Sequence, residues 1–219
     1  MLLAASVAAW TPPARLMRAS PLNATRLLSS TVSLHSGQNP WFADGLRFSC
    51  SACGNCCSGS PGYIYFTAEE ANNMARQLGM STNEFYRSKV RRVKPEGAGP
   101  EGPYLYTLEE TPAPDGNGQD CILLDRSSGK GLCSVYTARP SQCKSWPFWA
   151  GNVESADAWQ EAKAGTPCPG MGSGPLVSAT EVTRIAIEDE QNEHRLVMEA
   201  IAGTSEVEAA WLHAHSEGA

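Results

Sequence analysis

The sequence has no long hydrophobic run, little positive charge and none of the short motifs of common enzymes. No apolar stretch approaches the roughly 20 residues that cross a bilayer, so we expect no membrane-spanning segment. Lys and Arg number 17 against 23 Asp and Glu, and the formal charge of −6 argues against non-specific nucleic-acid binding. A Gly-rich phosphate loop, a nucleophile elbow, a His-Glu-x-x-His motif and a convincing histidine–carboxylate pair are absent. The sequence therefore favours a binding protein over an enzyme.

Acidic residues are missing from the first 43 positions, and the first one is Asp44. The same segment carries Arg15, Arg18 and Arg26 and is rich in serine. Such an acid-poor start is typical of an organellar transit peptide, with a disordered leader as the alternative. Residues 1–43 are therefore predicted to be a leader. We expect the mitochondrion as its destination, with the chloroplast as the alternative.

The rest of the chain is predicted to be a small, loop-rich α+β domain. Its 20 glycines and 15 prolines favour long ordered loops. Residues 67–70 (Thr-Ala-Glu-Glu) and 81–84 (Ser-Thr-Asn-Glu) have the capping-box pattern that opens helices. Two short helices should follow, the first ending near Leu78 with Gly79 as its left-handed C-cap, the second ending near Val90. A third box at Ser178 predicts a long helix to about Gly203, followed by a short helix from Ser205.

Strand signals are short and local. Runs of aromatic and aliphatic residues predict strands at 63–66 and 104–108, and a hairpin made of 121–125 and 132–136. Residues 137–174 are expected to be mostly loop.

All eight cysteines fall between positions 50 and 168. They are Cys50, Cys53, Cys56, Cys57, Cys121, Cys133, Cys143 and Cys168. The first four read Cys-x-x-Cys-x-x-Cys-Cys, and two-residue gaps let a loop curl so that successive thiolates converge on one centre. Gly54 and Asn55 tolerate the positive φ that such a curl needs.

Three interpretations of these cysteines compete. Metal binding through thiolates fits so dense a cluster in an intracellular protein. A disulfide scaffold fits the even count but needs an oxidising compartment, and the leader argues against secretion. Simple core packing does not explain the two-residue gaps. Because neighbouring side chains point in different directions, we expect that Cys56 and Cys57 do not ligate the same small tetrahedral ion.

Four further features accompany the cluster. They are Cys133-Ser-Val-Tyr-Thr-Ala-Arg-Pro-Ser-Gln-Cys143, Trp146-Pro147-Phe148, the segment from Cys168 to Gly174, and the helix start at Thr67 with its Leu78-Gly79 stop. Together they resemble the CxxCxxCC family of zinc- or iron-chelating domains, also described as iron–sulfur-cluster-containing proteins. The resemblance covers roughly residues 46–180, and no cysteine is missing. It implies that all eight cysteines are candidate metal ligands. We predict a metal-chelating domain over 44–180 and a helical extension over 181–219.

Iron–sulfur and zinc ligation both remain open. Cys50-x-x-Cys53-x-x-Cys56 matches the first three ligands of the bacterial ferredoxin run, whose remote fourth cysteine precedes a proline, as Cys168 does here. The working hypothesis is a [4Fe–4S] cluster on these four. Cys57, Cys121, Cys133 and Cys143 would then hold Zn²⁺, another cluster or nothing. Zinc is the rival, although two separated Cys-x-x-Cys pairs are its usual layout.

Two other residues are candidates for contact with the cofactor. Arg139 lies between two candidate ligands and could stabilise an anionic thiolate site, or it could bond loop carbonyls. Trp146 could wall the centre off from water, or be ordinary core. The predicted function is a metal-binding protein in metal handling or electron transfer, with an unidentified protein partner. A metal- or thiol-dependent redox enzyme and a structural zinc scaffold are the alternatives.

Overall fold

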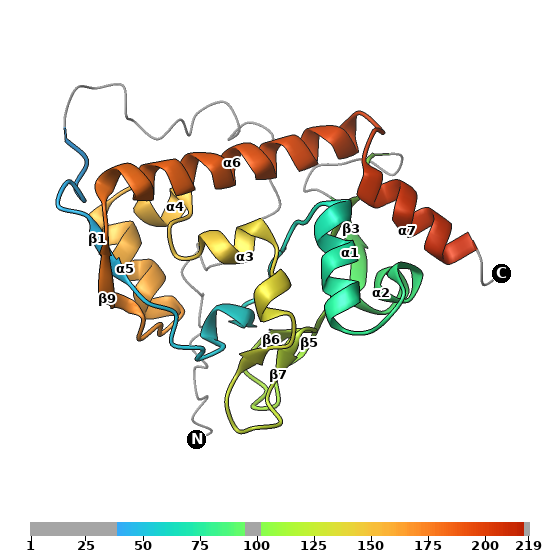
Figure 1. Ribbon diagram of the computed structural model, residues 1–219, viewed down its shortest axis with the longest axis horizontal. Helices are drawn as coiled ribbons and strands as arrows, with labels where there is room; N and C mark the ends of the chain where they lie inside the picture. The colour runs from blue at the N-terminus through green and yellow to red at the C-terminus, as the bar shows by residue number, and fades with distance from the viewer. Residues whose placement is uncertain (1–38, 95–101, 217–219) are drawn as a thin grey trace, which may run out of the picture.

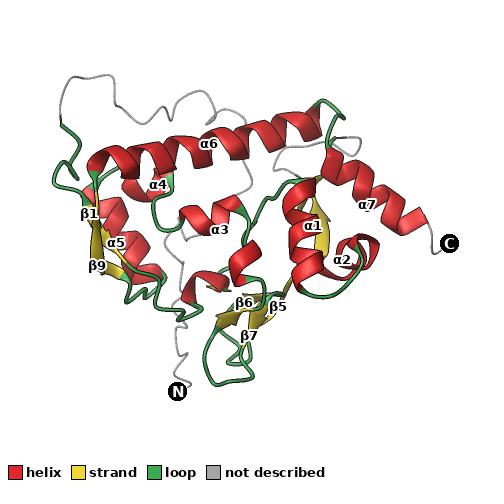
Figure 2. Cartoon of the chain, in the orientation of Figure 1, coloured by secondary structure: helices red, strands yellow, loops and turns green. Residues whose placement is uncertain are grey.

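The computed structural model describes residues 39–94 and 102–216, so most of the predicted leader lies outside the described residues (Figure 1). The fold is α+β, as predicted (Figure 2). The helices are α1 (Ala68–Gln77), α2 (Thr82–Lys89), α3 (Ser141–Ser145), α4 (Ala150–Val153), α5 (Ala156–Gly165), α6 (Ala179–Ile201) and α7 (Glu206–Ser216), with 3₁₀ turns η1 (Asn55–Cys57) and η2 (Tyr136–Ala138). The strands are β1 (Leu46–Phe48), β2 (Ser58–Gly59), β3 (Val90–Val93), β4 (Leu105–Leu108), β5 (Glu110–Pro112), β6 (Gln119–Cys121), β7 (Leu124–Asp125), β8 (Leu132–Cys133) and β9 (Met171–Val177).

The capping boxes define the helix starts that they predict. At α1 the Thr67 hydroxyl accepts a bond from the Glu70 N–H at 3.1 Å, and the Glu70 carboxylate accepts one from the Thr67 N–H at 2.9 Å. The helix ends before Gly79, which has a φ of 69°. At α6 the Ser178 hydroxyl accepts from the Glu181 N–H at 3.3 Å. The four predicted helices, now seen as α1, α2, α6 and α7, are therefore confirmed. Their starting signals lie within a single turn of chain.

The predicted strand at 63–66 is wrong, whereas β4 confirms the one at 104–108. Side chains take the place of a ladder: the Ile64 N–H donates to the Thr107 hydroxyl at 2.8 Å, and the Tyr65 N–H donates to the Gln142 carbonyl oxygen at 2.7 Å. The predicted hairpin exists but is shorter, with Leu124 opposite Cys133 in β7 and β8. Its first residue, Cys121, instead ends β6, the central strand of the sheet β2–β6–β5.

The prediction of loop over 137–174 is also wrong, since this segment contains α3, α4 and α5. Helices this short are marginal in isolation and form where tertiary packing holds them. Here the packing comes from Trp146, Phe148 and Trp159, which are buried together in one cluster. The Phe148 and Trp159 rings stack at 5.9 Å.

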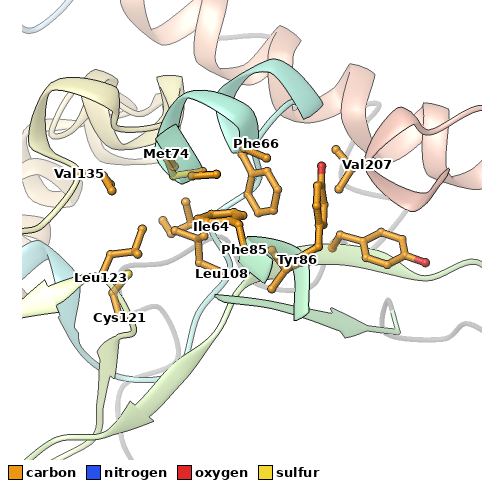
Figure 3. Packing of buried hydrophobic residues seen from close by; sticks show 14 of the residues in the cluster. Ile64, Phe66, Met74, Phe85, Tyr86, Leu108, Cys121, Leu123, Val135 and Val207 are labelled. Carbon is orange, nitrogen blue, oxygen red and sulfur yellow. The ribbon is translucent and has the colours of Figure 1, made fainter. Parts of the chain in front are cut away.

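Two main hydrophobic cores organise the molecule. The first joins α1, α2 and α7 to β4 and β6, with Phe66, Met74, Phe85 and Tyr86 at its centre (Figure 3). The second lies between the β1–β9 pair, α4, α5 and the start of α6. Helix α6 runs along one side of the molecule from the second core towards α7 (Figure 1). No helix among the described residues is long and apolar enough to cross a membrane.

The ends of the predicted domain are tied into these cores. Phe42 is buried in the second core, and the Trp41 indole donates to the Val153 carbonyl at 2.8 Å. At the other end, Val182 of α6 packs in the second core and Val207 of α7 in the first. The boundaries at 43 and 180 stay predictions, and the burial of Phe42 favours a leader that ends before Trp41.

Candidate metal centre

Sheet pairing brings the eight cysteines together from five segments of the chain. The Cys50–Cys57 loop connects β1 to β2, so both of its ends are held by strands. In the β2–β6 pair Ser58 lies opposite Asp120, which places Cys57 near Cys121. In the β1–β9 pair Phe48 lies opposite Met171, which places the start of the loop near Cys168. Cys133 ends β8 and Cys143 lies in α3.

Glycine shapes the loop that carries the first four cysteines. Gly54 has a φ of 75°, as predicted, and a Cβ at this position would lie 2.7 Å from the Gly131 Cα. The close approach of these two glycines brings Cys133 beside the loop. Asn55 does not adopt positive φ; Ala52 does, at 52°. Instead the Asn55 amide donates to the Pro167 carbonyl at 2.8 Å and ties the loop to the segment before Cys168.

Cys57, Cys121, Cys133 and Cys143 form one group of interacting thiols. The pKa of Cys57 is raised by its hydrogen bond with Cys56, by burial and by the charges of Cys56, Cys121 and Cys143. Burial raises the pKa of Cys143, and Cys121, Cys56 and Cys133 raise it further. These are the members of the second predicted ligand set, together with Cys56 from the first.

Cys168 and Cys53 form a second neighbourhood. Burial raises the pKa of Cys168 and the charge of Cys53 adds to this, while the backbone N–H groups of Gly170 and Met171 and the Trp146 indole oppose it. Cys50, which is exposed, interacts with the Tyr136 hydroxyl and with Cys133. Cys50 therefore adjoins the first group, and Cys56 adjoins both, since it interacts with Cys57 and Cys143 and packs against the core cluster that contains Cys168.

The Cys56 and Cys57 side chains were expected to point in different directions, but they lie close together. Their sulfurs are 3.9 Å apart because both residues lie in the η1 turn. Two thiolates on one tetrahedral zinc, at about 2.3 Å each, would be separated by about 3.8 Å. The two groups of thiols therefore meet at this pair.

The eight thiols are suitable ligands for a soft metal, but they are not arranged as a closed coordination site. None of the eight cysteines, all of which lie within the described residues, forms a disulfide. Thiolates are the ligands that zinc and iron–sulfur clusters prefer, and the raised pKa values mean that a metal would have to displace protons. Within the described parts of the chain, no three His, Cys, Asp or Glu side chains converge closely enough to hold an ion. Ligation of a metal would therefore draw the sulfurs closer together.

Charged side chains flank the thiols. The Arg139 Nε donates to the Tyr136 carbonyl at 3.0 Å, and its guanidinium lies 3.8 Å from the centre of the Tyr136 ring. Burial raises the pKa of Cys133, and the Val135 N–H and Arg139 oppose that effect. Arg139 thus bonds a loop carbonyl and also acts on the thiols.

One feature beside the cluster escaped the sequence analysis. Asp120 is buried, and its carboxylate pairs with the Arg126 Nε at 2.6 Å. Its other carboxylate oxygen accepts from the Ser58 hydroxyl at 2.6 Å. Arg126 also interacts electrostatically with Cys57. The only sequence signal was the position of Asp120 directly before Cys121.

Comparison with known protein families identifies a match. The profile of the CxxCxxCC family, described as "Putative zinc- or iron-chelating domain", matches residues 49–169, which is more than half of the 219-residue chain. The match begins just before the cysteine loop and ends just after Cys168. No solved structure matches the chain.

Proposed function

Since the chain belongs to the CxxCxxCC family of zinc- or iron-chelating domains, we propose that its eight cysteines hold two thiolate-ligated centres, one of them an iron–sulfur cluster. Family membership supports metal binding in general. The observation that carries the proposal is the gathering of eight cysteines without a disulfide, from five segments, into two adjoining groups. Cysteines that served only as apolar filling would have no reason to meet in this way.

Cys50, Cys53, Cys56 and Cys168 are the proposed cluster ligands. The spacing of the first three and the proline after the fourth fit the ferredoxin pattern. The interaction of Cys53 with Cys168 and the Asn55–Pro167 hydrogen bond support this set. A bound cluster would supply a one-electron redox centre.

Cys57, Cys121, Cys133 and Cys143 are the proposed second set. Four thiolates suit a structural zinc ion, whose role is to hold chain segments together. The four ligands come from η1, β6, β8 and α3. Each of these elements is only two to five residues long and has few internal hydrogen bonds to stabilise it. A metal here would join them.

The proposed role is metal handling or electron transfer with a protein partner, in the organelle that the first 43 residues would address. The mitochondrion is favoured, with the chloroplast as the alternative. One observation favours a second candidate, a structural zinc scaffold: the 3.9 Å separation of the Cys56 and Cys57 sulfurs suits one shared zinc ion.

Metal content decides between these functions. The full chain is purified under anaerobic conditions. Its content of iron, sulfide and zinc is then measured, and its visible spectrum is recorded. The double variant C53S/C168S should lose iron, sulfide and colour, and C57S/C143S should lose zinc but keep the colour. A colourless wild type with stoichiometric zinc and no iron would eliminate the cluster. Four disulfides without bound metal would end the whole proposal.

A further inference from the structure

A surface pocket of about 400 Å³ lies beside the cysteine cluster, between the face of α1 from Glu70 to Gln77 and the segment from η2 to α3. Its size is at the lower end of the range for small-molecule sites, roughly 300–1,000 Å³. All but one of the eight residues that line it are polar or charged. A ligand for this pocket would therefore be small and charged.

The acceptor groups of the pocket are already in use. The Glu70 carboxylate accepts from the Thr67 N–H at 2.9 Å and from the Ser141 N–H at 2.6 Å. The Gln77 carbonyl oxygen accepts from the Thr137 hydroxyl at 2.8 Å and from the Ala138 N–H at 3.1 Å. These bonds also fix η2 and α3 against α1, so the floor of the pocket is rigid.

The donor groups are in surplus. Arg76 gives one N–H to the Asn73 carbonyl oxygen at 3.2 Å, and Arg139 uses its Nε for the Tyr136 carbonyl. Over residues 39–94 and 102–216, neither arginine makes an ion pair with a carboxylate, and the same holds for Lys144. Three cations thus line the pocket with one carboxylate, in a chain whose formal charge is −6.

We propose that this pocket binds a small oxyanion, a phosphate or carboxylate group, through Arg76, Arg139 and Lys144. Two guanidinium groups offer paired N–H donors that match the two oxygens of such a group, and the ammonium adds a point charge. A neutral ligand would leave the cations uncompensated and would compete poorly with water. The anion would sit next to the thiols, because Arg139 belongs to both sites.

To test this, inorganic phosphate and citrate are titrated separately into the purified full chain at low salt. Binding is monitored by calorimetry and by changes in NMR chemical shift. We expect saturable binding of at least one anion. Arg76→Gln and Lys144→Gln should each weaken that affinity by about tenfold, the typical effect of removing one charge-assisted hydrogen bond. Arg195→Gln is the matched control, since Arg195 lies on α6 and pairs with Glu199.

The outcomes separate clearly. Binding of phosphate alone assigns the phosphate class, and binding of citrate alone assigns the polycarboxylate class. No saturable signal with either anion up to about 100-fold excess, or an equal loss in the Arg195→Gln control, would overturn the proposal. Metal content is measured on the same samples, so failure of the pocket and failure of the metal centres are distinguishable.

Discussion

The indole N–H of Trp146 is buried without a hydrogen-bond partner among the described residues, and it interacts with Cys168, whose pKa it lowers. Both side chains are 6% exposed and pack in the same core cluster. A buried N–H without an acceptor costs free energy, and a neutral thiol is a weak acceptor. A thiolate is a much better one. The Trp146 indole would therefore gain an acceptor if Cys168 were deprotonated, as the proposed metal centre requires.

Replacement of Trp146 by Phe should weaken metal binding without unfolding the protein. The ring remains, but the hydrogen bond to the thiolate is lost. Loss of such an outer contact typically reduces metal affinity by about 10- to 100-fold. Competition with a chromophoric chelator measures the change. Trp159→Phe is the control, because Trp159 is equally buried in the same cluster and stacks on Phe148. Equal affinities in the two variants would contradict a role for the indole N–H.

Replacement of Gly54 by Ala should both destabilise the protein and lower its metal content. Positive φ costs any L-residue about 1–2 kcal/mol, and here the new methyl group would also meet the Gly131 backbone at 2.7 Å. Gly79→Ala is the matched control, since Gly79 has a φ of 69° and open space around it. It should cost only about 1–2 kcal/mol and leave metal content unchanged. Urea unfolding and metal analysis of the two variants provide the comparison.

Glu193 should make folding stability fall as the pH rises through neutrality. Burial, and then the charges of Asp189 and Glu190, raise its pKa from 4.5 to about 7. Nearby, the hydroxyl of Tyr65 is buried without a partner. A carboxyl whose folded pKa is raised contributes stability that is complete below about pH 4.5 and is lost as the pH rises through about 7.

Glu193→Gln removes this titration. At pH 8 the variant should be more stable than the wild type by about 1–3 kcal/mol, and the difference should shrink towards pH 5. Urea unfolding at a series of pH values, with both proteins in the same metal state, measures the difference. Glu161→Gln, an exposed change on α5, should run parallel to the wild type. A pH-independent difference between Glu193→Gln and the wild type would refute the role of this carboxyl.

Removal of metal should lower the thermal midpoint of the protein. The proposed ligands pack against both main cores, with Cys121 in the first and Cys168 in the second, so metal binding would join the cores. Ligand binding to the folded state alone adds stability, about 4 kcal/mol at 1,000 times the dissociation constant. Calorimetry before and after chelation measures the loss. The C57S/C143S variant should lose less on chelation than the wild type, and an equal loss would count against the second centre.

The cysteine positions and the helix starts were readable from the sequence because their determinants are local. The Thr67–Glu70 box closes within one turn of chain, and Gly79 needs only its own backbone freedom to end α1. The Cys-x-x-Cys-x-x-Cys-Cys spacing likewise identifies thiolate chemistry without reference to the rest of the fold.

Everything that depends on distant partners was decided by the tertiary structure. Residues 63–66 have the composition of a strand, but the N–H groups of Ile64 and Tyr65 donate to the side chains of Thr107 and Gln142. Helices α3 to α5 form because aromatic side chains between them are buried in the second core. The closeness of Cys57 to Cys121 follows from the β2–β6 register, and the β1–β9 pair brings the start of the cysteine loop near Cys168. The sequence by itself determined which atoms can bind metal. Only long-range pairing and packing decided which of them are neighbours, because those contacts join residues that no local pattern relates.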